Sequence, residues 1–226
     1  MTIIRVVDFE TTGMELPAQV CEVGLCDLNL ETREIGSPRS WLCGVDSMPP
    51  EVRAIHHIQL ADCAGLAPFD PASILTTPCD AIASHMAEFE GKFWQPSAPV
   101  ICTYKAALRV WPDAPSHSNG ALRYWLEDQG LISLDSATAM PSHRAGPDAY
   151  VTAHILLALF DAGHTGKEMT GWTKQPRVLP KCTIGKFRGK PWSEVEGGFL
   201  SWMVRQDDME ADLKWNAQRE LDRRGG

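Results

Sequence analysis

Runs of apolar residues separated by polar segments predict five β-strands in the first half of the chain. Residues 3–8 are continuous and rich in β-branched side chains, which is typical of a central strand covered on both faces. Residues 20–26 and the stretch around 41–43 indicate an antiparallel meander, joined by the polar connection 29–39. Two further apolar runs suit the later strands: 81–84 and 100–103. We therefore expect an α/β fold with a five-stranded sheet.

Helical patterns fill the gaps between these runs, and the clearest one follows His143. Pro147 suits the first turn of a helix, where its missing N–H has no intrahelical partner. An apolar stripe then extends almost to Gly163 and consists of Val151, Ile155, Leu156 and Leu159. Shorter helices are expected over 51–57 and 118–130.

The last quarter of the chain differs in composition from the rest. A polar segment rich in Pro and Gly precedes a second unit, whose stretch 207–224 is charged and helical in pattern. We expect a main domain at 1–165, a linker at 166–181 and a small C-terminal module at 182–226.

Composition limits the classes of protein to consider. A chain of 226 residues with 44% hydrophobic content can bury one sizeable core. No segment reaches the length of a membrane span and the start has no signal-peptide pattern, so we expect a cytoplasmic protein without a membrane partner. The net charge of −8 argues against a broad basic surface that coats duplex nucleic acid. A nuclease that grips only a strand end stays compatible with this charge.

Seven cysteines are scattered along the chain without any Cys-x-x-Cys pair. Several lie inside apolar runs, so we interpret them as reduced core residues, with neither a zinc site nor a disulfide framework.

Two short segments, far apart in sequence, contain the candidate chemistry. The first strand ends in Asp8 and Glu10, which share one face because they are two apart on an extended backbone. His143 stands on the loop before the clearest helix, and Asp148 lies in its first turn. Three carboxylates and one imidazole are suited to binding divalent metals and to removing a proton from water. Each segment alone more often has a structural explanation, and their joint occurrence indicates phosphodiester hydrolysis.

On these motifs the sequence resembles the DnaQ-like 3′→5′ exonucleases of the DEDDh class, and within that family the exonuclease X branch. Segments 8–13 and 143–148 match the first and third family motifs. Further matches to the branch occur at 54–58, 101–103, 108–112, 118–119, 171–173, 185–190 and 193–195. The resemblance covers nearly the whole chain. It implies an RNase H-like, DnaQ-type mixed sheet flanked by helices, with a small C-terminal appendage.

The second family motif departs from the family pattern. It reads Ser-His-Met-Ala-Glu-Phe-Glu over 84–90, which places Glu90 where the family has Asp and Met86 where it has Asn. Glutamate can bind Mg²⁺ or Mn²⁺, but its extra methylene displaces the carboxylate by about a bond length. Glu88 is the alternative ligand if the local register differs.

The resemblance implies a two-metal mechanism. Two Mg²⁺ or Mn²⁺ ions would bind to Asp8, Glu10, Asp148 and Glu90, and His143 would act as the general base. The products would be 5′-mononucleotides released from a 3′ end.

The same resemblance points to Thr11 and Met14 as contacts to the terminal nucleotide, and to His56 as a residue that lines the site. Core packing of Met14 and a structural role for His56 are the alternatives. Lys186 and Arg188 lie near aromatic residues, a composition used to bind single strands. A small lid with an aromatic core is the alternative for that segment. Arg109 and Arg144 either contact phosphate or lie on a solvated face.

Three functions stay open at this point. The first is a metal-dependent exodeoxyribonuclease that acts on single-stranded or frayed 3′ ends of DNA in repair, recombination or end trimming. The second is an exonuclease of the same fold that trims RNA 3′ ends, since spacing does not reveal contacts to the 2′-OH. The third is a degenerate member that binds 3′ ends or a partner protein with little cleavage, because Glu90 and Met86 depart from the family.

Overall fold

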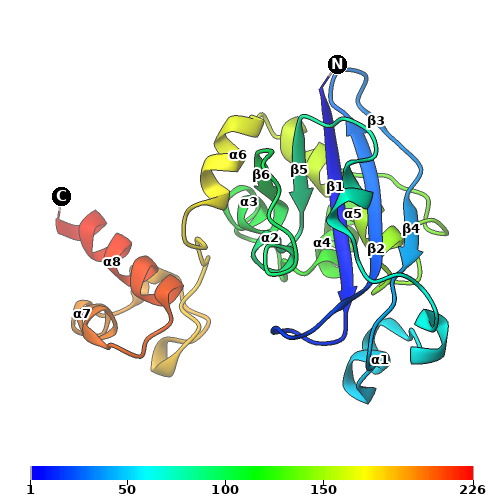
Figure 1. Ribbon diagram of the computed structural model, residues 1–226. Helices are drawn as coiled ribbons and strands as arrows, with labels where there is room; N and C mark the ends of the chain where they lie inside the picture. The colour runs from blue at the N-terminus through cyan, green and yellow to red at the C-terminus, as the bar shows by residue number, and fades with distance from the viewer. Residues whose placement is uncertain (1, 226) are drawn as a thin grey trace.

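The computed structural model describes residues 2–225, and its central feature is a mixed sheet flanked by helices (Figure 1). The strands are β1 (Ile3–Thr11), β2 (Val20–Asn29), β3 (Glu34–Ile35), β4 (Arg39–Leu42), β5 (Ala81–Ser84) and β6 (Val100–Cys102). Their order is β3-β2-β1-β5-β6, with β4 also paired to β2. β1 runs antiparallel to β2 and parallel to β5. The expected mixed sheet and fold class are confirmed, and the sixth strand is β3, which lies in the connection we expected to be irregular.

The alternation of side chains along β1 explains both the core and the position of the site. Ile4 and Val6 pack into the cluster beneath α5 (Ala145–Asp161), whereas Val7 and Phe9 pack into a second cluster on the opposite face. Because side chains on a strand alternate between faces, Asp8 and Glu10 continue the row of Ile4 and Val6. The sheet therefore presents both carboxylates on the face that α5 covers.

The remaining helices lie around the sheet, except for α7 and α8, which belong to the C-terminal part of the chain (Figure 1). They are α1 (Pro50–His56), α2 (Ala87–Glu90), α3 (Thr103–Val110), α4 (Asn119–Asp128), α6 (Gly166–Thr173), α7 (Gly197–Arg205) and α8 (Ala211–Gly225). Short 3₁₀ segments occur at η1 (Leu60–Cys63), η2 (Pro71–Leu75), η3 (Gly185–Phe187) and η4 (Trp192–Glu194). The helices expected over 51–57, 118–130 and after His143 are confirmed.

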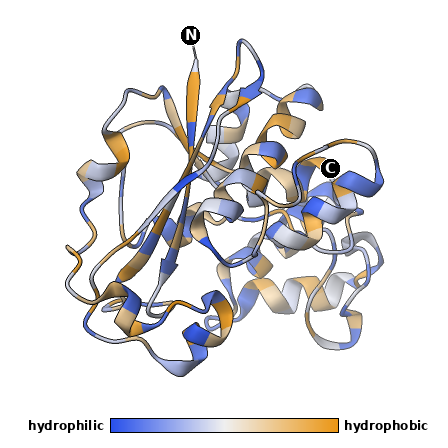
Figure 2. Ribbon diagram, turned by 90° about the vertical axis from the view of Figure 1, so that its right-hand side faces the viewer, coloured by the Kyte–Doolittle hydropathy of each residue, from blue (hydrophilic) through white to orange (hydrophobic). Residues whose placement is uncertain are grey.

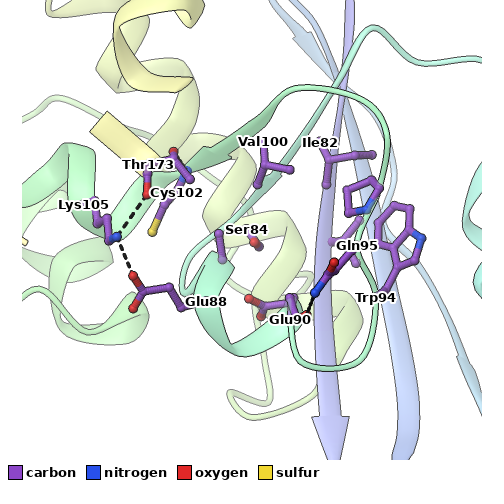
Figure 3. Close-up of a pocket in the computed structure, with 14 residues that line it drawn as sticks. Ile82, Ser84, Glu88, Glu90, Trp94, Gln95, Val100, Cys102, Lys105 and Thr173 are labelled. Atoms are coloured by element: carbon purple, nitrogen blue, oxygen red, sulfur yellow. Dashed lines mark hydrogen bonds and ion pairs between the residues drawn. The ribbon is translucent and has the colours of Figure 1, made fainter. Parts of the chain in front are cut away.

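The linker expected at 166–181 is shorter than the sequence indicated, because its first eight residues form α6. Thr165 and Glu168 form a capping box that starts this helix. Lys105 on α3 fixes the end of α6: its buried ammonium donates to the carbonyls of Thr173 (3.0 Å) and Gln175 (2.8 Å) and pairs with Glu88 (Figure 3).

The C-terminal module has its own apolar cluster. Phe187, Trp192, Leu200 and Met203 are buried there, together with Leu213 of α8. Figure 2 shows α8, which ends at the C-terminus, coloured largely as hydrophilic, so this helix buries only a narrow stripe. The division into two domains with a linker stays a prediction.

No helix within residues 2–225 is long and apolar enough to cross a membrane. All seven cysteines have free thiols, and six of them are buried.

Candidate active site

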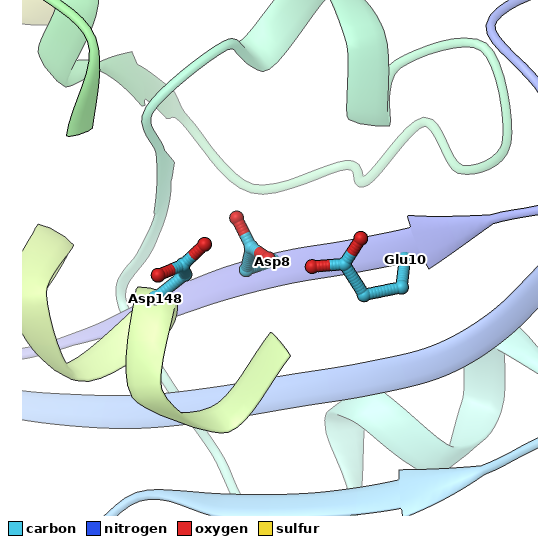
Figure 4. Close-up of side chains that lie close together, drawn as sticks. All are labelled: Asp8, Glu10 and Asp148. Atoms are coloured by element: carbon cyan, nitrogen blue, oxygen red, sulfur yellow. The ribbon is translucent and has the colours of Figure 1, made fainter. Parts of the chain in front are cut away.

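Three of the expected carboxylates converge beside β1 (Figure 4). Asp8 and Glu10 project from β1 and Asp148 from the first turn of α5. One carboxylate oxygen from each residue lies within 4.8 Å of the others. Oxygen ligands at this separation are suited to a hard divalent cation.

The start of α5 is held against β2, and this fixes the position of Asp148. Gly24 of β2 faces the backbone of Ala145, and a Cβ at Gly24 would lie 1.9 Å from the Ala145 carbonyl oxygen. The buried Glu22 accepts hydrogen bonds from Nε and Nη2 of Arg144, both at 2.8 Å, and from the N–H of Ala145 at 3.0 Å. Glycine and a buried ion pair thus bring the helix close enough for its first turn to reach the strand.

His143 lies on the loop directly before this helix, as expected. Its backbone N–H donates to Oδ2 of Asp148 at 3.0 Å, and its φ of 58° places it in the left-handed region that non-glycine residues seldom adopt. Its side chain is exposed and borders the same cavity as the three carboxylates. The imidazole is therefore open to solvent and to substrate.

The cavity has a volume of about 380 Å³ and brings together most of the expected site residues. Its lining includes Asp8, Glu10, Thr11, Met14, His56, Glu90, His143 and Asp148. A cavity of this size is in the range of small-molecule sites. Lys186 and Arg188 are not part of its lining and lie on the C-terminal module.

Burial, helped by neighbouring like charges, raises the pKa of the clustered carboxyls. Burial, and then the neighbouring Asp148 and Glu10, raise the pKa of Asp8 well above its ordinary value. Burial, Asp148 and Glu22 raise the pKa of Glu10 to about 8, against a lowering by Arg144. Burial also raises the pKa of Asp148. Bound cations would remove this cost, so the donor set fits divalent metal ions.

Glu90 lies at the end of α2 and borders the cavity, but it is outside the three-carboxylate group. Its side chain is buried, its Oε2 has no hydrogen-bond partner, and burial raises its pKa to about 8. Glu88, the alternative, is mostly exposed and pairs with Lys105. The geometry therefore favours Glu90 as the carboxylate of the second motif.

The three expected nucleotide contacts have different environments. Thr11 is buried and its hydroxyl donates to the Gly13 carbonyl at 2.7 Å. Met14 is 69% exposed, which excludes core packing and leaves its side chain as an open apolar wall. His56 is 2% exposed, and its Nδ1 accepts from the N–H of Ile58 at 3.0 Å. Burial lowers its pKa. His56 is thus both a satisfied structural residue and part of the cavity wall.

Two polar residues that line the cavity, Asn119 and His85, were not among the predicted site residues. Asn119 begins α4, donates from Nδ2 to the Asp148 carbonyl at 3.1 Å, and keeps a buried Oδ1 without a partner. His85 is buried, with Nδ1 at 3.0 Å from the Thr103 hydroxyl and Nε2 at 2.7 Å from the His117 carbonyl. Both stand within segments matched to the family, so the motifs themselves were the available signal.

None of the basic residues considered for phosphate contact lines the active-site cavity. Arg144 pairs with Glu22, as described above. Lys186 forms an ion pair with Glu196 at 3.0 Å on the surface of the C-terminal module. Phe187 and Trp192, near Lys186 and Arg188, are buried in the core of that module. Their burial agrees with the alternative of a small aromatic-cored unit.

No protein-family model matches the chain. Exodeoxyribonuclease 10 of Escherichia coli strain K12 is 28% identical over 227 residues, which cover 97% of this chain and 99% of the relative. The similarity thus includes the C-terminal module as well as the site.

Solved structures show the same relationship. Exonuclease X in complex with 5′ overhanging duplex DNA superposes with a TM-score of 0.64 and 26% identity, covering 75% of this chain and 99% of that one. The nuclease domain of 3′hExo, a DEDDh family member bound to rAMP, has the same fold, with a TM-score of 0.54 and 17% identity over 71% of this chain and 92% of that one. The resemblance to DEDDh exonucleases, and among them to exonuclease X, is confirmed.

Proposed function

Because the chain is similar over nearly its whole length to exonuclease X of the DEDDh exonucleases, we propose that it is a metal-dependent 3′→5′ exodeoxyribonuclease. One observation supports this function above all others. Asp8, Glu10 and Asp148 converge within 4.8 Å beside a cavity that His143 also borders. This arrangement provides cation ligands and a proton acceptor at a single place.

The cofactors in this proposal are two divalent ions, Mg²⁺ or Mn²⁺. Asp8, Glu10 and Asp148 would bind them, and the unpartnered Oε2 of Glu90 offers a further oxygen. When bound, such ions stabilise charge on the phosphate oxygens and lower the pKa of water.

The protein's own groups supply the rest of the chemistry. His143 takes the proton from the attacking water. The carboxylate of Asp148 holds the loop in place by accepting a hydrogen bond from the backbone N–H of His143. Thr11, Met14 and His56 enclose the terminal nucleotide, with Met14 against the base. The scissile bond is the last phosphodiester, so each catalytic cycle releases a 5′-mononucleotide and shortens the strand by one nucleotide.

The proposed substrates are single-stranded or frayed 3′ ends of DNA, in keeping with the names of the relatives. Lys186 and Arg188 would meet such a strand outside the cavity, where Glu196 competes for Lys186. RNA 3′ ends are the alternative substrate, and a cytoplasmic location stays a prediction.

The experiment that tests the function compares hydrolysis by the native chain with His143→Ala. Loss of the general base should lower kcat about a hundredfold to ten-thousandfold and remove the acidic limb of the pH–rate profile. His57→Asn is the matched control, since His57 is exposed and does not line the cavity. A rate and pH profile unchanged in His143→Ala would contradict the assignment.

One observation favours a second candidate, a protein that binds 3′ ends and cleaves them poorly. Glu90, which stands where the family has Asp, lies outside the group of three carboxylates whose oxygens converge. The Glu90 variants described in the Discussion decide between the two candidates.

A further inference from the structure

A second cavity lies where α3 meets the C-terminal module, and we call it the junction cleft. Its volume is about 470 Å³. The lining comes from α3, from the segment after α6 and from α8, and consists of Leu108, Arg109, Pro112, Gln175, Val178, Pro180, Trp215 and Arg219.

The charge of the junction cleft is opposite to that of the protein. Arg109 and Arg219 are the charged residues in its lining, and none of the described lining residues is acidic. The chain as a whole has a net charge of −8, so a site with two arginines and no carboxylate is unusual for it. This selection of residues favours an anionic ligand.

Neither arginine has a carboxylate partner among residues 2–225. Arg109 is half-buried and donates to neutral acceptors: the Lys105 carbonyl (2.8 Å), Gln175 Oε1 (3.2 Å) and the Pro176 carbonyl (3.1 Å). Arg219 is exposed and lies over the ring of Trp215, 5.6 Å from its centroid. Burial, and then repulsion from Arg219, lower the pKa of Arg109. An anion between the two guanidinium groups would relieve that repulsion.

The walls of the cleft are held together on both sides. Lys105 and Arg109 bind the carbonyls of the segment that follows α6, as described above. On the module side, Asn216 of α8 donates from Nδ2 to the Arg177 carbonyl at 2.7 Å and accepts from the N–H of Leu179 at 3.1 Å. Arg177 also pairs with Asp212 and Glu210. The connecting segment is thus fastened to both the main domain and the module.

We propose that the junction cleft binds the phosphodiester backbone of the DNA strand whose 3′ end occupies the active site. Arg109 and Arg219 pair with phosphate, and Trp215 provides a face for a base, the combination that single-strand sites use. The inference rests on the proposed function and deepens it by adding a second contact to the same strand. In Figure 1, α2, which ends in Glu90 at the active site, and α3, which borders the cleft, lie between β1 and the module. In this proposal the strand leaves the site along this side and continues to the cleft.

The test uses the full chain in EDTA, so that bound strands stay intact, and measures affinity by fluorescence anisotropy. The probes are a labelled tetranucleotide and a labelled single strand of about twenty nucleotides. The variants are Arg219→Ala and Arg219→Glu. Arg205→Ala is the matched control, because Arg205 is an exposed arginine of the same module that does not line the cleft.

For the long strand, we expect Arg219→Ala to weaken binding about threefold to tenfold and to lower the slope of log affinity against log salt by about one. Arg219→Glu should weaken binding further. The tetranucleotide should bind equally well to all variants, and Arg205→Ala should stay within about twofold of the native chain. Unchanged long-strand affinity in both Arg219 variants would overturn the proposal.

A small substrate separates this inference from the proposed function. Hydrolysis of the p-nitrophenyl ester of thymidine 5′-monophosphate needs the active site alone. If the native chain and the Arg219 variants hydrolyse it equally while long-strand affinity does not depend on Arg219, only the cleft proposal fails. If no chain hydrolyses it with Mg²⁺ or Mn²⁺ and long-strand affinity still depends on Arg219, the cleft proposal stands and the nuclease proposal fails.

Discussion

The active-site cavity and the junction cleft have opposite charge. Each brings together charged side chains of one sign that have no ion-pair partner of the other sign among the described residues. In the active site, Asp8, Glu10 and Asp148 face one another, and no Lys or Arg within residues 2–225 forms an ion pair with them. In the cleft, Arg109 and Arg219 face each other without a carboxylate. Burial, together with repulsion between like charges, raises the pKa of Asp8 and lowers the pKa of Arg109.

Other charged residues of the protein form ion pairs, unlike those of the two cavities. Glu22 is even more buried than the three clustered carboxylates but is neutralised by Arg144, and the exposed Lys186 pairs with Glu196. Like charges left to face one another in a cavity are typical of a binding site that a ligand of the opposite sign completes. We infer that cations complete the first site and phosphates the second.

The largest expected effect comes from neutralising the centre of the acidic site. Asp8→Asn should lower the rate of hydrolysis of every substrate by roughly a thousandfold or more, because it removes a cation ligand. The same variant should raise the thermal midpoint of the metal-free protein by a few degrees, since it relieves the repulsion around Asp8. Kinetics with the p-nitrophenyl ester measure the loss of rate, and differential scanning fluorimetry in EDTA measures the rise of the thermal midpoint.

A lower rate of hydrolysis together with a higher thermal midpoint would show that Asp8→Asn removes a catalytic group and does not unfold the protein. A variant that is both inactive and less stable in EDTA would contradict the electrostatic account of the cluster.

A smaller effect is expected at Glu90, the carboxylate outside the cluster. Glu90→Gln should lower kcat about tenfold to a hundredfold, because it removes an acidic oxygen that borders the cavity. Glu90→Asp, which restores the family residue, should stay within about threefold of the native rate. Steady-state kinetics with Mn²⁺ provide the measurement, and Glu88→Gln is the control, since Glu88 does not line the cavity.

If only Glu90→Asp cleaves and the native chain binds without turnover, the second candidate function is the correct one. Identical rates in Glu90→Gln and the native chain would instead exclude Glu90 from the site.

The smallest expected effect is a dependence of stability on pH. Glu10 and Glu90 have a pKa of about 8 in the folded chain, against an ordinary value of 4.5. A carboxyl with a raised pKa contributes its stability fully below the ordinary value, and this contribution is lost as the pH rises through the folded value. In EDTA the thermal midpoint should therefore fall by a few degrees between about pH 5 and pH 8 and change little at higher pH.

Adding Mg²⁺ or Mn²⁺ should restore the midpoint, most strongly at the higher pH, because a cation binds the ionised carboxylates. Glu10→Gln should flatten the pH dependence. A midpoint in EDTA that is constant or rises over this range would show that the carboxyls ionise freely in the folded chain.

The acidic site could be predicted from the sequence because its members lie at the ends of regular elements. Asp8 and Glu10 follow a strand of obvious apolar character, and Asp148 lies in the first turn of a helix that Pro147 marks. Local patterns define such positions, and only the approach of α5 to β2, through Gly24, had to be supplied by the fold. Asn119 was missed because its role depends on that packing.

Strand β3 and the junction cleft could not be predicted, because they depend on contacts between residues that are distant in sequence. Strand β3 is two residues long and exists only through its pairing with β2. Helix α6 did have a local signal in Thr165 and Glu168, which was overlooked among the polar residues of the expected linker. The junction cleft had none, since Arg109 and Arg219 are separated by most of the second half of the chain.

The most direct test of the central claim follows a 5′-labelled single DNA strand over time with Mg²⁺, Mn²⁺ or EDTA. We expect a ladder of products that shorten by one nucleotide from the 3′ end, with 5′-mononucleotides released, and no products in EDTA or with Asp8→Asn. Internal cuts, or cleavage that persists in EDTA, would contradict it.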